Sequence, residues 1–190
     1  MYKISDNKYF YHIPKTSGTS LYMDGNFKYL GDHKFHQHST INWWETYLKT
    51  NFDDIEIYTI VRNPYSRIVS FWRYANRNWS YHNSFVDFLN KENEMDAELS
   101  ELNAAYDTKT TMTEHLKNRN GEIRTKIYKY ETDLEKLGKD LNLKNYPYRN
   151  KHLVMPYYDW RNFYNKDLQK LVYDMFYEDF KNFGYEEEIS

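Results

Sequence analysis

A lysine followed by small residues is the feature of this sequence best suited to chemistry. Residues 8–22 read KYFYHIPKTSGTSLY, in which Lys15 comes directly before Thr16, Ser17, Gly18, Thr19 and Ser20. Small side chains let backbone N–H groups crowd around one anion, and a helix beginning there adds its positive dipole end. The lysine adds a full charge. The pattern predicts an anion-binding loop after a strand, with an ordinary strand-to-helix turn as the alternative.

The loop differs from the phosphate loop of nucleoside-triphosphate enzymes. That loop follows the pattern G-x-x-x-x-G-K-[ST], whose Ser or Thr binds Mg²⁺. Here Lys15 precedes Gly18, and no Ser or Thr follows a Gly-Lys pair.

A second basic corner follows at residues 56–74, EIYTIVRNPYSRIVSFWRY. Residues 57–61 form a β-branched run typical of a buried strand, Asn63 can cap a helix, and Pro64 suits its first turn. The helix would place Arg67 and Ser70 on one side, with Arg77, and an apolar stripe on another. Between Glu56 and Asp87 there are four arginines and no acid, in a chain of formal charge −2. A second anion site is expected, with a solvated arginine face as the alternative.

The segment FHQHSTINWW supplies His36 and His38 as candidate bases, because histidine has an unperturbed pKa close to neutral pH. An H-x-H pair could equally be a metal site or two surface histidines, but a metal needs further ligands and neither Cys nor a close acidic cluster accompanies this pair. A carboxylate or His115 remains a further alternative for the base.

These segments together resemble a known family. HIPKTSGTS is similar to the 5′-phosphosulfate loop, and VRNPYSRIVSFW to the 3′-phosphate motif, of sulfotransferases that use 3′-phosphoadenosine 5′-phosphosulfate (PAPS). The closest likeness is to carbohydrate sulfotransferases of the heparan-sulfate 2-O-sulfotransferase type, whose motifs read H-[IV]-P-K-T and R-[DN]-P-x-x-R-x-x-S. The segments IYKYETDLEKLGKDLNL and VYDMFYEDFKNFGYE look like weaker matches further along.

The resemblance implies roles for particular residues. Lys15 and residues 16–20 would hold the 5′-phosphosulfate, and Arg62, Arg67 and Ser70 would hold the 3′-phosphate. Lys151, in the basic loop formed by residues 149–152, would lie near the same phosphate, with a merely solvated loop as the alternative. Comparison with the family's H-x-H and H-[AS]-T segments favours His38 over His36 as the base. Glu131, after a predicted strand, is assigned a structural role.

Composition and pattern predict one α/β domain with a P-loop-like, central parallel sheet flanked by helices on both faces. The 190 residues suffice for one core, in which 21 Tyr, 11 Phe and 5 Trp must supply much of the buried area. Strands are expected at 8–13, 27–30, 55–61 and 123–130, a loop and helix over 16–24, and helices at 40–50, 63–79, 84–91, 132–142 and 165–181. In parallel sheets ligands bind beyond the carboxyl ends of the strands, where Lys15 and Arg62 fall.

The resulting expectation is a sulfotransferase that uses PAPS, without a metal, on a hydroxyl of a small molecule or oligosaccharide. The alternatives are a P-loop kinase-like transferase and a degenerate nucleotide-binding module that has lost turnover. A sequence pI near 6.4 disfavours nucleic acid as a partner. Without a signal peptide or a membrane-length apolar run, a cytoplasmic enzyme that needs no membrane is expected. The acceptor is not specified, because residues 80–120 carry no recognisable motif.

Overall fold

The computed structural model describes residues 1–18, 21, 27–31, 38–78, 84–90, 110–143 and 159–189. Its sheet contains five strands in the order β3-β1-β2-β4-β5. Their bounds are β1 Tyr2–Ser5, β2 Lys8–Tyr11, β3 Lys28–Tyr29, β4 Glu56–Val61 and β5 Lys126–Lys129.

The three strands that carry the predicted loops are parallel, as expected: β2 pairs with β4, and β4 with β5. The expectation of a parallel sheet is wrong for the other two strands, because β1 pairs antiparallel with both β2 and β3. Only Asp6 and Asn7 separate β1 from β2, and a connection this short can join only antiparallel neighbours. The sheet is therefore mixed.

Seven α-helices lie within the described ranges, and two of them, α9 and α10, replace the single helix expected at 165–181. Their bounds are α2 Ile41–Leu48, α3 Pro64–Asn78, α4 Phe85–Asn90, α7 Met112–Leu116, α8 Leu134–Asp140, α9 Lys166–Met175 and α10 Tyr177–Phe183. No helix among the described residues is both long enough and apolar enough to span a membrane.

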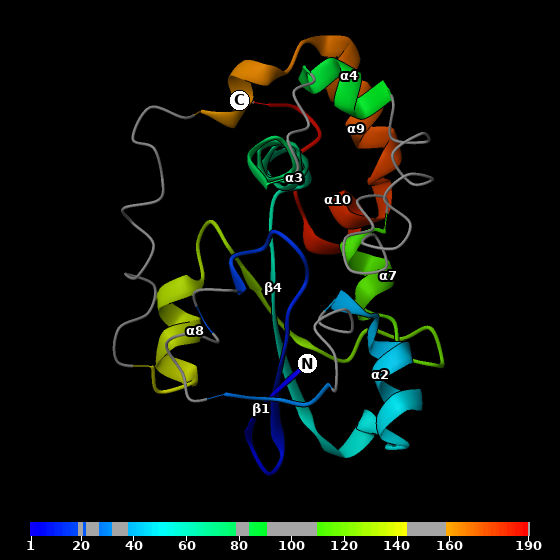
Figure 1. The fold of residues 1–190 in the computed structure, drawn as a ribbon, viewed down its shortest axis with the longest axis vertical. Coiled ribbons are helices and arrows are strands. Elements are labelled where there is room, and N and C mark those ends of the chain that lie inside the picture. The colour runs from blue at the N-terminus through cyan, green and yellow to red at the C-terminus, as the bar shows by residue number, and fades with distance from the viewer. Residues whose placement is uncertain are drawn as a thin grey trace.

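Helices cover both faces of the sheet, as predicted (Figure 1). Alternate residues of β4 point to opposite faces, so Ile57 and Val61 pack with α2 and α7 in one core, whereas Tyr58 and Ile60 pack with α8 in another. A third apolar cluster joins α3 to α4, α9 and α10. The turn from β4 to α3 therefore connects two packed regions: the end of β4 lies in the first core, and the buried side of α3 lies in the third cluster.

Candidate functional site

The three parallel strands end side by side, and the predicted loops emerge from the same edge of the sheet. Tyr11 of β2 lies opposite Thr59 of β4, and Val61 of β4 lies opposite Lys129 of β5. The segment after β2 begins at His12, and the segment after β4 begins at Arg62. Strand register therefore brings the two basic segments together.

The loop after β2 has an unusual backbone. Lys15 and Ser17 have positive φ angles of 64° and 76°, although neither is glycine. Such angles are rare for residues with side chains, and they cluster at functional sites. Two left-handed residues so close together are compatible with an anion-binding nest, in which left-handed residues help turn successive N–H groups toward one side. Thr16, which is fully buried, holds this shape by donating from Oγ1 to the Ile13 carbonyl at 2.8 Å.

Gly18 is required by the packing of the same loop. A Cβ at this position would lie 2.0 Å from Cδ2 of His12, a distance that no real side chain tolerates. The His12 ring is itself buried between Phe10 and His38. The loop therefore turns back directly over the imidazole, and only a glycine allows that approach.

Arg62 connects the two predicted anion loops. Its Nη1 donates to the Lys15 carbonyl at 3.2 Å, and its Nε donates to Oγ of Ser66 at 2.7 Å. The guanidinium also lies 4.6 Å from the ring centroid of Tyr130, just after β5. Segments following all three parallel strands thus meet at Arg62.

The first turn of α3 is fixed by Asn63, as the sequence predicts. Its Oδ1 accepts hydrogen bonds from the backbone N–H groups of Tyr65 and Ser66, at 3.0 and 3.3 Å. The backbone N–H of Asn63 donates to Oε1 of Glu131 at 2.9 Å, and the other carboxylate oxygen accepts from Tyr185. Glu131 therefore has the structural role expected of it.

One line of α3 residues runs between the two cations. Ser66, Ser70 and Tyr74 are four residues apart, so their side chains share a face of the helix. Arg62 is bonded to the first of them, and Nζ of Lys15 lies 4.1 Å from the ring centroid of Tyr74. The half-buried Ser70 lies between Ser66 and Tyr74 on this face of the helix, where its hydroxyl can donate to a bound anionic group.

The Lys15 side chain has a lowered pKa. Burial lowers its pKa from the ordinary value to about 8, and the positive charge of Arg62 adds to the shift. Near pH 7 the ammonium is still mainly protonated, but it holds its proton weakly. A bound anion would raise this pKa again.

Arg67 occupies a different position from its neighbours on the helix. Its side chain is only 2% exposed, with Nε donating to the Pro14 carbonyl at 3.2 Å and Nη1 to the Thr110 carbonyl at 3.3 Å. Arg67 is therefore buried and supports the loop by its bond to Pro14, whereas Arg62 is partly exposed. Its charge also opposes the effect of burial on the nearby Asp179, whose pKa burial raises.

His38 lies next to the start of the loop. Its ring is 7% exposed, and its Nδ1 lies 3.2 Å from the carbonyl oxygen of His12. A carbonyl can only accept, so Nδ1 carries the proton and the lone pair lies on Nε2. Burial lowers the pKa of His38 to about 4, so the ring is neutral at pH 7. The arrangement is that of a preformed, weak base.

Two further histidines join this cluster. His12 lies edge-on to His38, with ring centroids 4.8 Å apart, and His115 contacts the hydroxyl of Tyr11 through Nδ1 at 2.9 Å. Burial lowers the pKa of both well below the usual value. The sequence analysis gives His115 as an alternative base and assigns no role to His12, although His12 is the first residue of the H-[IV]-P-K-T motif and directly follows a strand.

Some predicted site residues lie outside the described residues: Thr19, Ser20, His36 and Lys151, with the remainder of the basic loop at 149–152. Within the described ranges, no group of three His, Asp or Glu side chains is placed to hold a metal ion.

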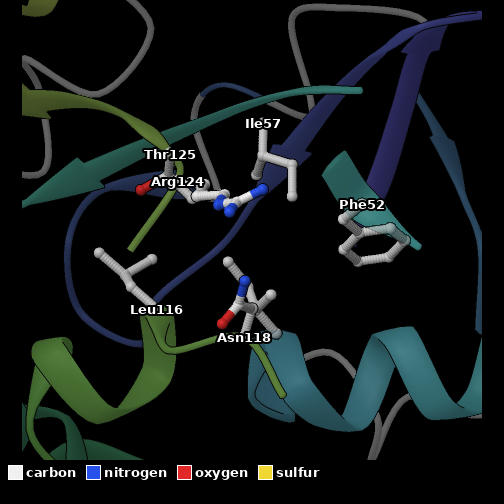
Figure 2. Close-up of a pocket in the computed structure, with 7 residues that line it drawn as sticks. Phe52, Ile57, Leu116, Asn118, Arg124 and Thr125 are labelled. Atoms are coloured by element: carbon white, nitrogen blue, oxygen red, sulfur yellow. The ribbon is translucent and has the colours of Figure 1, made fainter. Parts of the chain in front are cut away.

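A small pocket lies at the opposite end of β4, away from the loops (Figure 2). It lies between Ile57 at the start of that strand and Leu116 at the end of α7, with Phe52 and Asn118 also in its wall. None of the predicted site residues lines it.

Comparison of this chain with family models, curated proteins and solved structures found no match.

Proposed function

We propose that this protein is a sulfotransferase that takes a sulfuryl group from PAPS and transfers it to a hydroxyl group of a saccharide. The observation that carries the proposal is the bond from Arg62 Nη1 to the Lys15 carbonyl, because it joins the two segments that resemble the family's two phosphate motifs. Those segments are 47 residues apart in sequence. A donor with two separated phosphates requires two such segments to lie next to each other.

The residues present fit such a donor. The positive-φ backbone of Lys15 and Ser17 suits a 5′-phosphosulfate, together with the lysine ammonium. Arg62 and Ser70 provide a guanidinium and a hydroxyl for the 3′-phosphate. Thr19, Ser20 and Lys151 remain sequence predictions for the same contacts. When bound, PAPS supplies an activated sulfuryl group and a phosphate leaving group.

Lys15 would act on the leaving group. As the bond between sulfur and the bridging phosphate oxygen breaks, negative charge grows on that oxygen. A protonated, largely buried ammonium stabilises the growing charge more strongly than an exposed one, because less water screens it. The interaction is stronger in the transition state than in the ground state, so it would accelerate the transfer itself.

His38 would act on the acceptor. Its Nε2 lone pair would accept the hydroxyl proton as the acceptor oxygen bonds to sulfur. The His12 carbonyl, which accepts from Nδ1, would then stabilise the positive imidazolium and keep the ring in the same orientation. The tautomer is already correct before any ligand binds.

The decisive experiment is a binding titration with 3′-phosphoadenosine 5′-phosphate, AMP and ATP in the presence of EDTA. Two linked anion sites predict that the 3′-phosphorylated nucleotide binds far more tightly than the others. Equal affinity for AMP would contradict the two-site proposal, and tight, Mg²⁺-dependent ATP binding would favour a kinase-like transferase. Tight binding without sulfuryl transfer to any saccharide hydroxyl would point to a degenerate nucleotide-binding module.

A further inference from the structure

Tyr11, the last residue of β2, and the next residue, His12, both form hydrogen bonds to the segment that contains His38. The His12 carbonyl accepts from His38, and the Tyr11 hydroxyl donates to the Ser39 carbonyl at 2.9 Å. One residue later, Thr40 caps α2 by accepting at Oγ1 from the Trp43 N–H. Three consecutive residues are therefore fixed, and the Tyr11 side chain supplies the middle attachment.

Tyr11 is oriented in turn by His115. Its oxygen lies 2.9 Å from Nδ1 of His115, and both side chains are buried. A hydroxyl has one proton, which Tyr11 gives to the Ser39 carbonyl, so Nδ1 of His115 must donate to the Tyr11 oxygen. Nε2 of His115 makes no hydrogen bond to any described residue. Among the described residues, the hydrogen bond to Tyr11 is therefore the one that orients this ring.

His115 is held in place by the packing of its helix against α10. It lies on α7, whose N-terminus is capped by Asp179 of α10. That carboxylate accepts from the backbone N–H groups of Met112 and Thr113 at 2.8 and 2.7 Å. Thr111 adds a second cap, with Oγ1 accepting from Glu114. Because both caps fix the position of α7, His115 on this helix can orient the Tyr11 hydroxyl.

We propose that Tyr11 and His115 are positioning residues that hold His38 in its Nδ1–H tautomer and in reach of the acceptor. Neither side chain lies in the anion loops, so their loss should leave nucleotide affinity unchanged. The effect on turnover rests on the proposed function, whereas the effect on the His38 ring does not. Displacement of a catalytic group by about 1 Å can cost on the order of 10²-fold in rate.

The test begins with the nucleotide-free protein. Two-bond ¹H–¹⁵N correlation spectra distinguish the two imidazole tautomers, and a His38→Asn variant assigns the signal. We expect the Nδ1–H tautomer in the wild type and a mixture in Tyr11→Phe. The matched control is Tyr128→Phe, which removes another buried tyrosine hydroxyl, bonded to Asp140 on the opposite face of the sheet. In this control the His38 spectrum should match the wild type.

His115 is tested by a pair of substitutions. His115→Leu removes the donor to Tyr11 and should also produce mixed tautomers. His115→Asn keeps an N–H donor near the position of Nδ1, so it should restore the wild-type spectrum. If Tyr11→Phe does not fold, this pair alone decides the question.

Turnover provides the second measurement. Tyr11→Phe and His115→Leu should lower kcat by about 10–100-fold, with the Kd for 3′-phosphoadenosine 5′-phosphate unchanged. An unchanged His38 tautomer in both variants would overturn the proposal. A changed tautomer in a protein with no sulfuryl transfer would support the positioning role and contradict the proposed function instead.

Discussion

Arg62 bonds to the backbone of Lys15 and leaves the lysine side chain to reach across to Tyr74. The two cations therefore contact different groups within one cluster. Each lowers the proton affinity of its surroundings, as the effect of Arg62 on the pKa of Lys15 shows. Two positive charges in one cluster raise each other's electrostatic energy, and bound anionic groups lower it, so the arrangement is suited to binding anions.

Arg62→Ala should weaken binding of 3′-phosphoadenosine 5′-phosphate by about 1.5–3 kcal/mol, the range for a hydrogen bond to a charged group. Ser70→Ala should cost less, because it removes a neutral donor. Isothermal titration calorimetry measures both. The control is Arg161→Ala, which removes an exposed arginine bonded to Asp159. An Arg62→Ala protein that binds as tightly as this control would show that Arg62 has no part in binding.

Lys15 should make nucleotide binding depend on pH. Its pKa of about 8 means that the ammonium loses its proton as pH rises through 8, well below the ordinary value for lysine. Affinity should therefore fall between pH 7.5 and 9.5, and binding near pH 8.5 should take up a proton. Calorimetry in buffers of different ionisation enthalpy measures that uptake. Lys15→Arg, which stays charged, should show neither effect; if it behaves as the wild type does, another group is titrating.

The turn from β4 into α3 at Arg62 could be predicted because the residues that indicate it are adjacent in sequence. A β-branched run, an N-cap and a proline occupy consecutive positions, and the structure places β4, Asn63 and α3 accordingly. The sequence analysis does not predict β1 or α7, although Thr111 and Glu114 before and within α7 have the spacing of a helix N-cap. The strand β1 has four residues, and α7 has five, which is too short for a helical period to appear.

The arrangement within the site was harder to predict. Tyr11 and His115 are 104 residues apart, and no local pattern indicates that they meet. Helical spacing places Arg67 with Ser70 on the side of the helix away from the apolar stripe, where the sequence predicts that it can meet a ligand. It is buried instead because two backbone carbonyls accept its N–H groups, which offsets the cost of removing the charge from water. Pairings of this kind depend on tertiary contacts that the sequence does not display.

Gly18→Ala should disturb the site through His12. A methyl group would meet the buried imidazole, so the loop or the ring must shift, at a cost of about 1–3 kcal/mol of unfolding free energy. Nucleotide affinity should fall as well. Gly121→Ala is the control: it has a φ of 78° but nothing within 4 Å of the added Cβ. It should lower stability through backbone strain alone and leave affinity unchanged, as urea titrations and calorimetry can establish. Equal losses of affinity in both variants would refute a specific role for the Gly18 contact.

His38→Ala should retain nucleotide affinity and lose about 10²–10⁴-fold in turnover, the usual range for general acid–base catalysis. The wild-type pH profile of kcat/KM should show an acidic limb near pH 4, because burial lowers the pKa of His38 to that value. The limb should be absent in the variant. Near-normal turnover in His38→Ala would indicate that His36 is the base instead. If His36→Ala also had near-normal turnover, the base would be His115 or a carboxylate.

The buried histidines should also make the fold sensitive to mild acid. His12, His38 and His115 all have a pKa lowered by burial, so between about pH 6.5 and 5 the unfolded chain binds more protons than the folded one. The free energy of unfolding must then fall as pH falls, approaching about 1.4 kcal/mol per pH unit for each histidine. Urea denaturation from pH 7 to 5 measures the slope. His115→Asn, which keeps the bond to Tyr11 but cannot titrate, should reduce the slope by one proton's share. A wild-type stability that is flat across this range would mean that the three rings are not held neutral by the fold.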